Sequence, residues 1–303
     1  MSPSATSRAQ AARGPAGQLR TRAEEAASVL PPLLVQAQQL AGAVLLGEHG
    51  RRRSGVGDDF WQYRPAAQGD SRRMIDHRRS ARGDLQYVRE REWQIAQTVH
   101  LWVDQGQSMR FSSDRNLPQK VTRARLMGLA MAVLMVRGGE RVGLTGGRLP
   151  PRRGNMQILR MAEHFTSDED MTPYAPPEHR ALIPHARALF LSDFLGPFEE
   201  LEVALSKAAD RGLRGVLMQV LDPTEEAFPF AGRTRFEGPG DGTIHETLKA
   251  SALRDRYLDR LAERRDALER LCRAAGWTFG IHHTGDSAQA GLLWLYHALE
   301  RRT

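Results

Sequence analysis

The sequence contains a single cysteine, three lysines among 43 basic residues, and no apolar run long enough to cross a bilayer. A single cysteine excludes an intramolecular disulfide and any cysteine cluster for zinc. The apolar run at residues 126–135 is about half as long as the roughly 20 residues that a membrane-spanning helix needs. The start of the chain lacks the apolar core of a secretory signal. We therefore expect no membrane insertion and a cytoplasmic location.

Arginine supplies almost all of the positive charge, and the formal net charge at pH 7 is +7. The densest charged block, residues 51–92, holds eleven arginines and seven acidic residues, with aromatic side chains between them. Arginines beside aromatic residues can bind nucleic acid by stacking. The seven acids would weaken a phosphate-binding stripe, so we favour a folded module in which arginines pair with acids. Four arginines of this block are candidates for contact with a partner: Arg72, Arg73, Arg78 and Arg79.

From residue 98 onward, short apolar segments alternate with amphipathic ones. Strands are expected at residues 99–103, 141–145, 188–191, 215–221 and 277–283, and helices at 120–136, 155–165, 197–211, 250–275 and after 286, with a hairpin at 234–247. This regular alternation implies parallel strands joined by right-handed crossovers. We predict an α/β fold, in which helices flank an open, mostly parallel sheet in a Rossmann-like three-layer sandwich.

The chain before this alternation divides into two parts. Residues 1–20 have the composition of a disordered terminus. Residues 21–46 carry a helical pattern that breaks near Pro31 and Pro32, because the residue before a proline disfavours helix. We group residues 21–97 as an N-terminal helical and Arg-rich module, and residues 98–303 as the α/β domain.

Two expected strands end in aspartate, with Asp104 after the first and Asp193 after the third. The carboxyl ends of parallel strands lie at one edge of the sheet, where open α/β sheets bind ligands. With Ser108, these aspartates offer oxygen ligands of the kind that Mg²⁺ and Ca²⁺ prefer. The alternative is that both aspartates cap nearby backbone amides.

At this edge the sequence resembles a known motif. Asp104-Gln105-Gly106-Gln107-Ser108 is similar to the Asp-x-Ser-x-Ser metal-ion-dependent adhesion motif of von Willebrand factor type A domains. A second set of residues resembles the signature that precedes such a domain in the bacterial family called "domain of unknown function 58", and the resemblance covers about residues 40–303. This set comprises Phe60, Arg64, Gly69-Asp70, Arg73, Ile75-Asp76, Ser80-Ala81-Arg82 and Val88-Arg89-Glu90.

The resemblance implies a type A-like fold and a rim that recognises a partner protein, alongside a MoxR-type AAA+ ATPase in chaperone-like assembly or maturation. The chain departs from the motif at Gly106, which stands where the motif has its first serine. A degenerate site of Asp104, Ser108 and Asp193 should therefore bind Mg²⁺ weakly at best. The partner would then contact Arg110, the loop at residues 166–184, or the Arg-rich module.

Two alternatives from other classes remain open. One is nucleic-acid binding through residues 51–91, whose affinity would fall steeply with salt. The other is a divalent-cation-dependent hydrolase that uses Asp104 and Asp193. The sequence has no phosphate-binding Gly-x-x-x-x-Gly-Lys-Ser/Thr loop, no His-Glu-x-x-His pair and no Gly-x-Ser-x-Gly elbow. We therefore expect a non-enzymatic protein.

Overall fold

The computed structural model describes residues 31–48, 60–66, 75–81, 85–91, 96–167, 172–240, 242 and 244–300. The chain divides into two units. Residues 47–96 form the smaller unit, and residues 1–46 together with 97–303 form the larger one. The larger unit holds the predicted sheet.

A parallel five-stranded sheet forms the middle layer of the larger unit, with the strand order β4-β3-β5-β6-β9. Its strands are β3 (Thr98–Val103), β4 (Arg141–Leu144), β5 (Arg187–Ser192), β6 (Arg214–Leu221) and β9 (Thr278–His283). All four pairings are parallel. The strands β3 and β5 are buried along nearly their whole length, as expected for a parallel sheet that is covered on both faces. The predicted α/β fold is confirmed.

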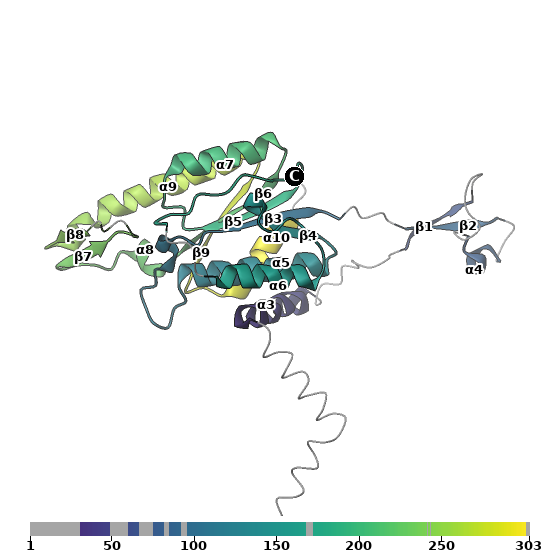
Figure 1. Ribbon diagram of the computed structural model, residues 1–303, viewed down its shortest axis with the longest axis horizontal. Coiled ribbons are helices and arrows are strands. Elements are labelled where there is room, and N and C mark those ends of the chain that lie inside the picture. Colours follow the sequence, from purple (N-terminus) through teal and green to yellow (C-terminus); the bar gives the residue numbers. More distant parts are fainter. Residues whose placement is uncertain are drawn as a thin grey trace, which may run out of the picture. The chain divides into compact units, whose positions relative to one another are not determined.

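Helices cover both faces of this sheet (Figure 1). One face is covered by α5 (Lys120–Arg137), α6 (Asn155–Thr166) and α10 (Ala288–Glu300), and α3 (Pro32–Glu48) packs into the same hydrophobic cluster on the outer side of α5 and α6 (Figure 1). The other face is covered by α7 (Phe198–Asp210) and α9 (Arg254–Ala275). The result is the expected arrangement of three layers.

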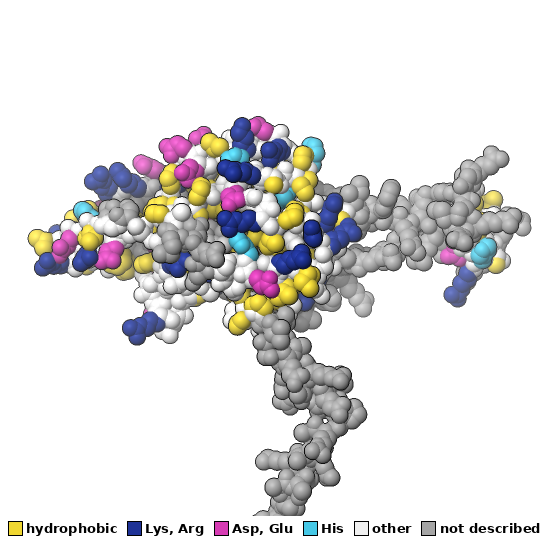
Figure 2. Space-filling model, viewed as in Figure 1, with side chains coloured by type: hydrophobic (Ala, Val, Ile, Leu, Met, Phe, Trp, Pro, Cys, Tyr) yellow, Lys and Arg dark blue, Asp and Glu magenta, His cyan; other side chains and the backbone are white. Residues whose placement is uncertain are grey.

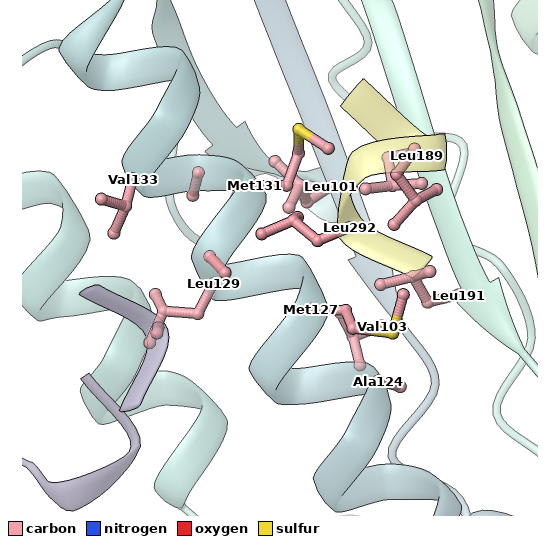
Figure 3. Close-up of a cluster of buried hydrophobic side chains, with 14 of the residues drawn as sticks. Leu101, Val103, Ala124, Met127, Leu129, Met131, Val133, Leu189, Leu191 and Leu292 are labelled. Atoms are coloured by element: carbon pink, nitrogen blue, oxygen red, sulfur yellow. The ribbon is translucent and has the colours of Figure 1, made fainter. Parts of the chain in front are cut away.

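Alternate side chains of the three central strands β3, β5 and β6 enter two separate cores, because successive residues of a strand point to opposite faces. In β3, Leu101 and Val103 belong to the core under α5, whereas Trp102 belongs to the core under α7 and α9. Figure 3 shows the first core, where side chains of β3, β5, α5 and α10 meet: Leu101, Val103, Leu189, Leu191, Met127, Met131 and Leu292. This packing fixes the position of the strand ends at which the candidate site lies.

Helix α3 belongs to the larger unit, whereas the sequence grouped it with the Arg-rich module. Leu34, Ala37, Ala41 and Val44 recur at helical spacing and are buried in the hydrophobic cluster that also contains the side chains of α5. An apolar helical stripe has to pack against another element, and here it packs on the sheet domain. The helix begins at Pro32, where the sequence predicted a break.

Two shorter elements follow β6. Helix α8 (Pro223–Ala227) is a single turn that the sequence did not predict. The strands β7 (Thr234–Glu237) and β8 (Ile244–Thr247) pair in an antiparallel hairpin, as predicted. No helix in the described part of the chain is both long and apolar enough to cross a membrane.

The smaller unit contains an antiparallel pair, β1 (Phe60–Pro65) and β2 (Tyr87–Arg91), and the short helix α4 (His77–Ser80). Ser80 Oγ accepts a hydrogen bond from the backbone N–H of Tyr87, which joins α4 to β2. Much of the Arg-rich block, and all of residues 1–20, lie outside the described residues.

A buried polar cluster at the carboxyl edge of the sheet

Asp104 follows β3 directly and is 2% exposed. Its Oδ1 accepts a hydrogen bond from the backbone N–H of Gly106 at 2.8 Å, and its Oδ2 accepts one from the hydroxyl of Ser192 at 2.6 Å. Burial, together with the nearby charge of Asp193, raises the pKa of Asp104 to about 7. These hydrogen bonds come from neutral donors, and both carboxylate oxygens of Asp104 are engaged.

Asp193 follows β5, the strand next to β3, and is fully buried. Its Oδ2 accepts a hydrogen bond from the ammonium group of Lys120 at 2.8 Å. The same ammonium group donates to Oε1 of Glu225 at 2.6 Å. The side chains of Lys120 and Glu225 are 1% and 15% exposed. Asp193 therefore belongs to a buried ion triad, and we call Lys120, Asp193 and Glu225 the lysine triad.

Lys120 is the first residue of α5, where the positive end of the helix dipole disfavours a cation. Burial lowers the pKa of Lys120, but the charges and hydrogen bonds of Asp193 and Glu225 outweigh this effect and raise the pKa above its ordinary value. The ammonium group therefore stays charged, and it joins α5 to β5 and to α8.

Glu225 is held by the capping box at the start of α8. Its Oε2 accepts a hydrogen bond from the backbone N–H of Asp222 at 2.8 Å, and Asp222 accepts in return from the backbone N–H of Thr224 at 2.9 Å. One oxygen of Glu225 thus closes the helix end, and the other faces Lys120. Burial raises the pKa of Glu225, and the Lys120 charge partly opposes that rise.

A segment of the predicted loop covers the motif around Asp104, and we call residues 172–177 the lid segment. The backbone N–H of Gln107 donates to the carbonyl of Thr172 at 2.8 Å, and that of Ser108 donates to the carbonyl of Pro173 at 3.0 Å. A Cβ atom at Gly106 would lie only 2.8 Å from the backbone nitrogen of Ala175. The cavity left between Asp104 and the lid segment is about 20 Å³, too small for a ligand larger than a water molecule.

The predicted metal ligands do not fit a divalent cation. Asp104 and Asp193 lie at the same edge, as expected, but their oxygens have different protein partners. Ser108 is buried, and its hydroxyl has no hydrogen-bond partner among the described residues. Two carboxylates that already accept protein hydrogen bonds, and one hydroxyl near a buried ammonium group, are a poor donor set for a cation that requires about six oxygens. The described residues contain no group of three or more His, Cys, Asp or Glu side chains that could hold a metal ion.

Arg110, one of the predicted partner-binding residues, lies at this edge. It ends the 3₁₀ turn Gln107–Arg110 and is half-buried. Arg78 is exposed on α4 in the smaller unit. Arg72 and Arg73 lie outside the described residues, as does the side chain of Arg79.

Sequence reasoning missed Lys120, Glu225 and Asp222. Asp222-Pro223-Thr224-Glu225 is a capping-box pattern with proline at the first helical position, so the start of α8 could have been predicted from the sequence. The sequence gives weaker evidence for a special role of Lys120, which is one of only three lysines and begins an apolar helix. Nothing in the sequence joins Lys120 to Glu225, which lies 105 residues further along the chain.

A family model described as "Protein of unknown function DUF58" matches residues 62–267. No curated protein matches the chain.

Three solved structures are distantly similar. An aerotolerance-related membrane protein from Bacteroides fragilis is 11% identical, over 67% of this chain and 98% of that one, with a TM-score of 0.37. The conserved hypothetical protein BatB from Bacteroides thetaiotaomicron is 13% identical, over 67% and 97%, with a TM-score of 0.36. An uncharacterised membrane-spanning protein from Vibrio fischeri is 18% identical, over 68% and 98%, with a TM-score of 0.21.

Proposed function

Because the chain belongs to the family described as protein of unknown function DUF58, we propose that it is a non-enzymatic protein-interaction module. In this proposal it acts with a MoxR-type AAA+ ATPase in the chaperone-like assembly or maturation of a protein complex. Such an ATPase consumes ATP, so the proposal puts the contact in the cytoplasm.

The observation that carries this proposal is the closure of the polar cluster. Asp104, Lys120 and Asp193 are at most 2% exposed, and each charged group is engaged by a neighbour within the chain. A catalytic group has to touch its substrate, and a metal-dependent hydrolase would need Asp104 and Asp193 to face a bound cation. Because the buried cluster is closed to substrates and cations, we propose that a partner is recognised by the shape and charge of the surface around it.

The surface above this cluster offers such a contact. Two hollows of about 350 and 660 Å³ lie beside the lid segment and share Arg148, Pro176 and Glu178 in their linings. Arg148 is exposed, and Val203, which lines the larger hollow, is 49% exposed. Arg148, Pro176, Glu178 and Val203 form a mixed apolar and charged surface, which we call the lid surface. Its composition is typical of the interface core and rim of a transient complex.

Binding to a purified ATPase tests the proposal. The full chain should bind one of the host's MoxR-type ATPases in at least one nucleotide state, as measured by calorimetry. The double variant Arg110→Glu, Arg148→Glu should weaken binding about tenfold or more, because it reverses the charge of Arg110, a predicted partner contact, and of Arg148 on the lid surface.

Arg270→Glu is the matched control. Arg270 is exposed near the end of α9 that leads into β9, hence at the opposite, amino edge of the parallel sheet. Its substitution should leave binding unchanged. Failure of every MoxR-type ATPase of the host to bind, in any nucleotide state, would sink the proposal.

Nucleic-acid binding is the weaker candidate. On the face drawn in Figure 2, the described Lys and Arg side chains are scattered among acidic and apolar ones and form no continuous stripe. The block at residues 51–91 lies largely outside the described residues, so this alternative stays a prediction. Its test is an affinity for duplex or single-stranded DNA that falls steeply with salt, through the release of counterions.

A further inference from the structure

We propose that the ammonium group of Lys120 is the resident cation of this edge, in the place that a divalent metal ion has in the adhesion motif that the sequence resembles. The edge is then held together without metal. This inference concerns the chain alone and does not depend on the ATPase partner.

The geometry of the lysine triad carries the first step. The Lys120 nitrogen lies 2.8 Å from Asp193 Oδ2 and 2.6 Å from Glu225 Oε1, and it also lies 5.8 Å from the centre of the Phe111 ring. Charge-assisted hydrogen bonds of this length are strong when they are buried. The ammonium group thus joins two carboxylates from separate elements, as a bound metal ion would.

The charges carry the second step. A divalent cation bound by Asp193 would lie a few ångströms from the Lys120 ammonium group, in surroundings that screen charge poorly. Like charges at such a distance disfavour one another strongly. Asp104 has less capacity left to compensate, since each of its oxygens already accepts a hydrogen bond, from Ser192 or from Gly106. The triad therefore excludes a second cation as long as Lys120 stays charged.

The lid segment closes the same place by a second, steric route. Gly106 lacks the hydroxyl that the adhesion motif would supply, and a Cβ atom there would crowd the backbone of Ala175 and Oδ1 of Asp104. The backbone hydrogen bonds from Gln107 and Ser108 hold the lid segment down. A partner's acidic side chain therefore has no open route to complete a metal shell.

The consequence for function is that the edge keeps one shape at any concentration of divalent cations. A type A site that needs metal responds to metal removal, whereas the lysine triad does not. Partner binding through the lid surface should therefore survive chelation.

A manganese titration of the full chain tests the inference. The wild-type protein should give no saturable heat with MnCl₂ up to millimolar concentration, relative to NaCl at matched ionic strength. Lys120→Ala removes the ammonium group and leaves two buried carboxylates beside the vacated space. It should bind Mn²⁺ at least about tenfold more tightly than wild type, and the double variant Lys120→Ala, Asp193→Asn should lose that binding.

Lys207→Ala is the control, because Lys207 is exposed on α7; it should behave as wild type. Saturable binding by the wild-type protein that Asp193→Asn abolishes would overturn the inference. So would a folded Lys120→Ala variant that binds Mn²⁺ no better than wild type.

A second measurement needs no variant at position 120, which matters where Lys120→Ala fails to fold. With ¹⁵N-labelled lysine, the three lysines give three side-chain ammonium signals, assigned through Lys207→Arg and Lys249→Arg. The Lys120 signal should be protected from exchange with water at neutral pH and should keep its width when Mn²⁺ is added. Rapid exchange, or paramagnetic broadening beyond that of the exposed lysines, would contradict the proposed role.

Discussion

Asp104 and Asp193 each follow the last residue of a strand, in the neighbouring parallel strands β3 and β5, and both are buried, although the register places Asp193 one residue beyond the position level with Asp104. Their partners differ. Asp104 accepts hydrogen bonds from neutral donors, and its pKa rises to about 7, because burial disfavours its charge. Asp193 faces the charged Lys120. The position of a carboxylate in the fold therefore determines how deeply it is buried. A single residue far away in the sequence determines whether the buried carboxylate has a charged partner.

Removing the charge of Lys120 should cause the largest loss of stability, because it removes the feature that distinguishes Asp193 from Asp104. Lys120→Met keeps most of the side-chain volume but leaves Asp193 and Glu225 without their counter-charge. The loss of one member of a buried ion group costs about 3–5 kcal/mol of the free energy of unfolding. Urea unfolding monitored by circular dichroism measures the change.

Lys207→Met is the matched control for this variant. Lys207 is exposed, so its substitution should change the free energy of unfolding by less than about 0.5 kcal/mol. Equal effects of the two substitutions would mean that the lysine triad adds nothing to stability.

The pH dependence of stability should distinguish Asp104 from ordinary carboxylates. The pKa of Asp104 is raised from 3.8 to about 7 in the folded state. Between these values the folded state keeps the proton that the unfolded state has lost. The contribution of Asp104 to stability therefore falls as pH rises through this window, the opposite of a salt-bridged carboxylate.

Asp104→Asn should abolish this fall, because the amide does not ionise. The two proteins should have similar stability near pH 4, and the variant should gain relative to wild type up to pH 7. The raised pKa corresponds to roughly 4 kcal/mol at most, less whatever the amide loses in hydrogen bonding to Ser192 and Gly106. Urea unfolding at a series of pH values measures the difference, with the exposed Asp210→Asn as control. A constant difference across this pH range would show that Asp104 is ionised throughout.

Much of the fold could be predicted from local pattern. Unbroken apolar strands alternating with amphipathic helices identify a parallel sheet, and the sheet brings Asp104 and Asp193 to one edge. Helix α3 was grouped with the wrong part of the chain, because its apolar stripe indicates burial but not against which element.

The chemistry of the edge could be predicted much less well. The expected strand ends drew attention to Asp104, Ser108 and Asp193, all of which lie near the ends of β3 and β5. The decisive residue, Lys120, lies on a helix, and its contact with Glu225 depends on how α5 and α8 meet in three dimensions. A lysine at a helix start reads as a solvated charge in any local pattern. Only the arrangement of α5, β5 and α8 reveals that it is buried.

Restoring the first serine of the adhesion motif, at position 106, should cause an intermediate loss of stability. Gly106→Ser puts a Cβ atom 2.8 Å from the backbone nitrogen of Ala175 and 3.1 Å from Oδ1 of Asp104. Such crowding in a packed region costs about 1–3 kcal/mol. The variant should also gain no Mn²⁺ binding, since Lys120 is still present. Gly232→Ser is the control in unfolding experiments, because a Cβ atom there meets nothing within 4 Å. A stable Gly106→Ser variant that binds Mn²⁺ would mean that the missing hydroxyl, and not Lys120, keeps the metal out.

The smallest coupling free energy is expected for an exposed ion pair. Comparison with this pair shows how much burial strengthens the ion pairs of the lysine triad. Arg233 and Glu246 on the β7–β8 hairpin lie 2.6 Å apart, as close as Lys120 and Glu225, but their side chains are 71% and 49% exposed. Solvent and salt screen such a pair, so a double-mutant cycle of Arg233→Ala and Glu246→Ala should give a coupling of about 0.2–1 kcal/mol, decreasing with added NaCl. The corresponding cycle of Lys120→Met and Glu225→Gln should give a larger coupling that changes little with NaCl, because water does not reach the buried ammonium group. Equal couplings with equal salt dependence would mean that the edge of the sheet is open to solvent, and the contrast between Asp104 and Asp193 would then lose its physical basis.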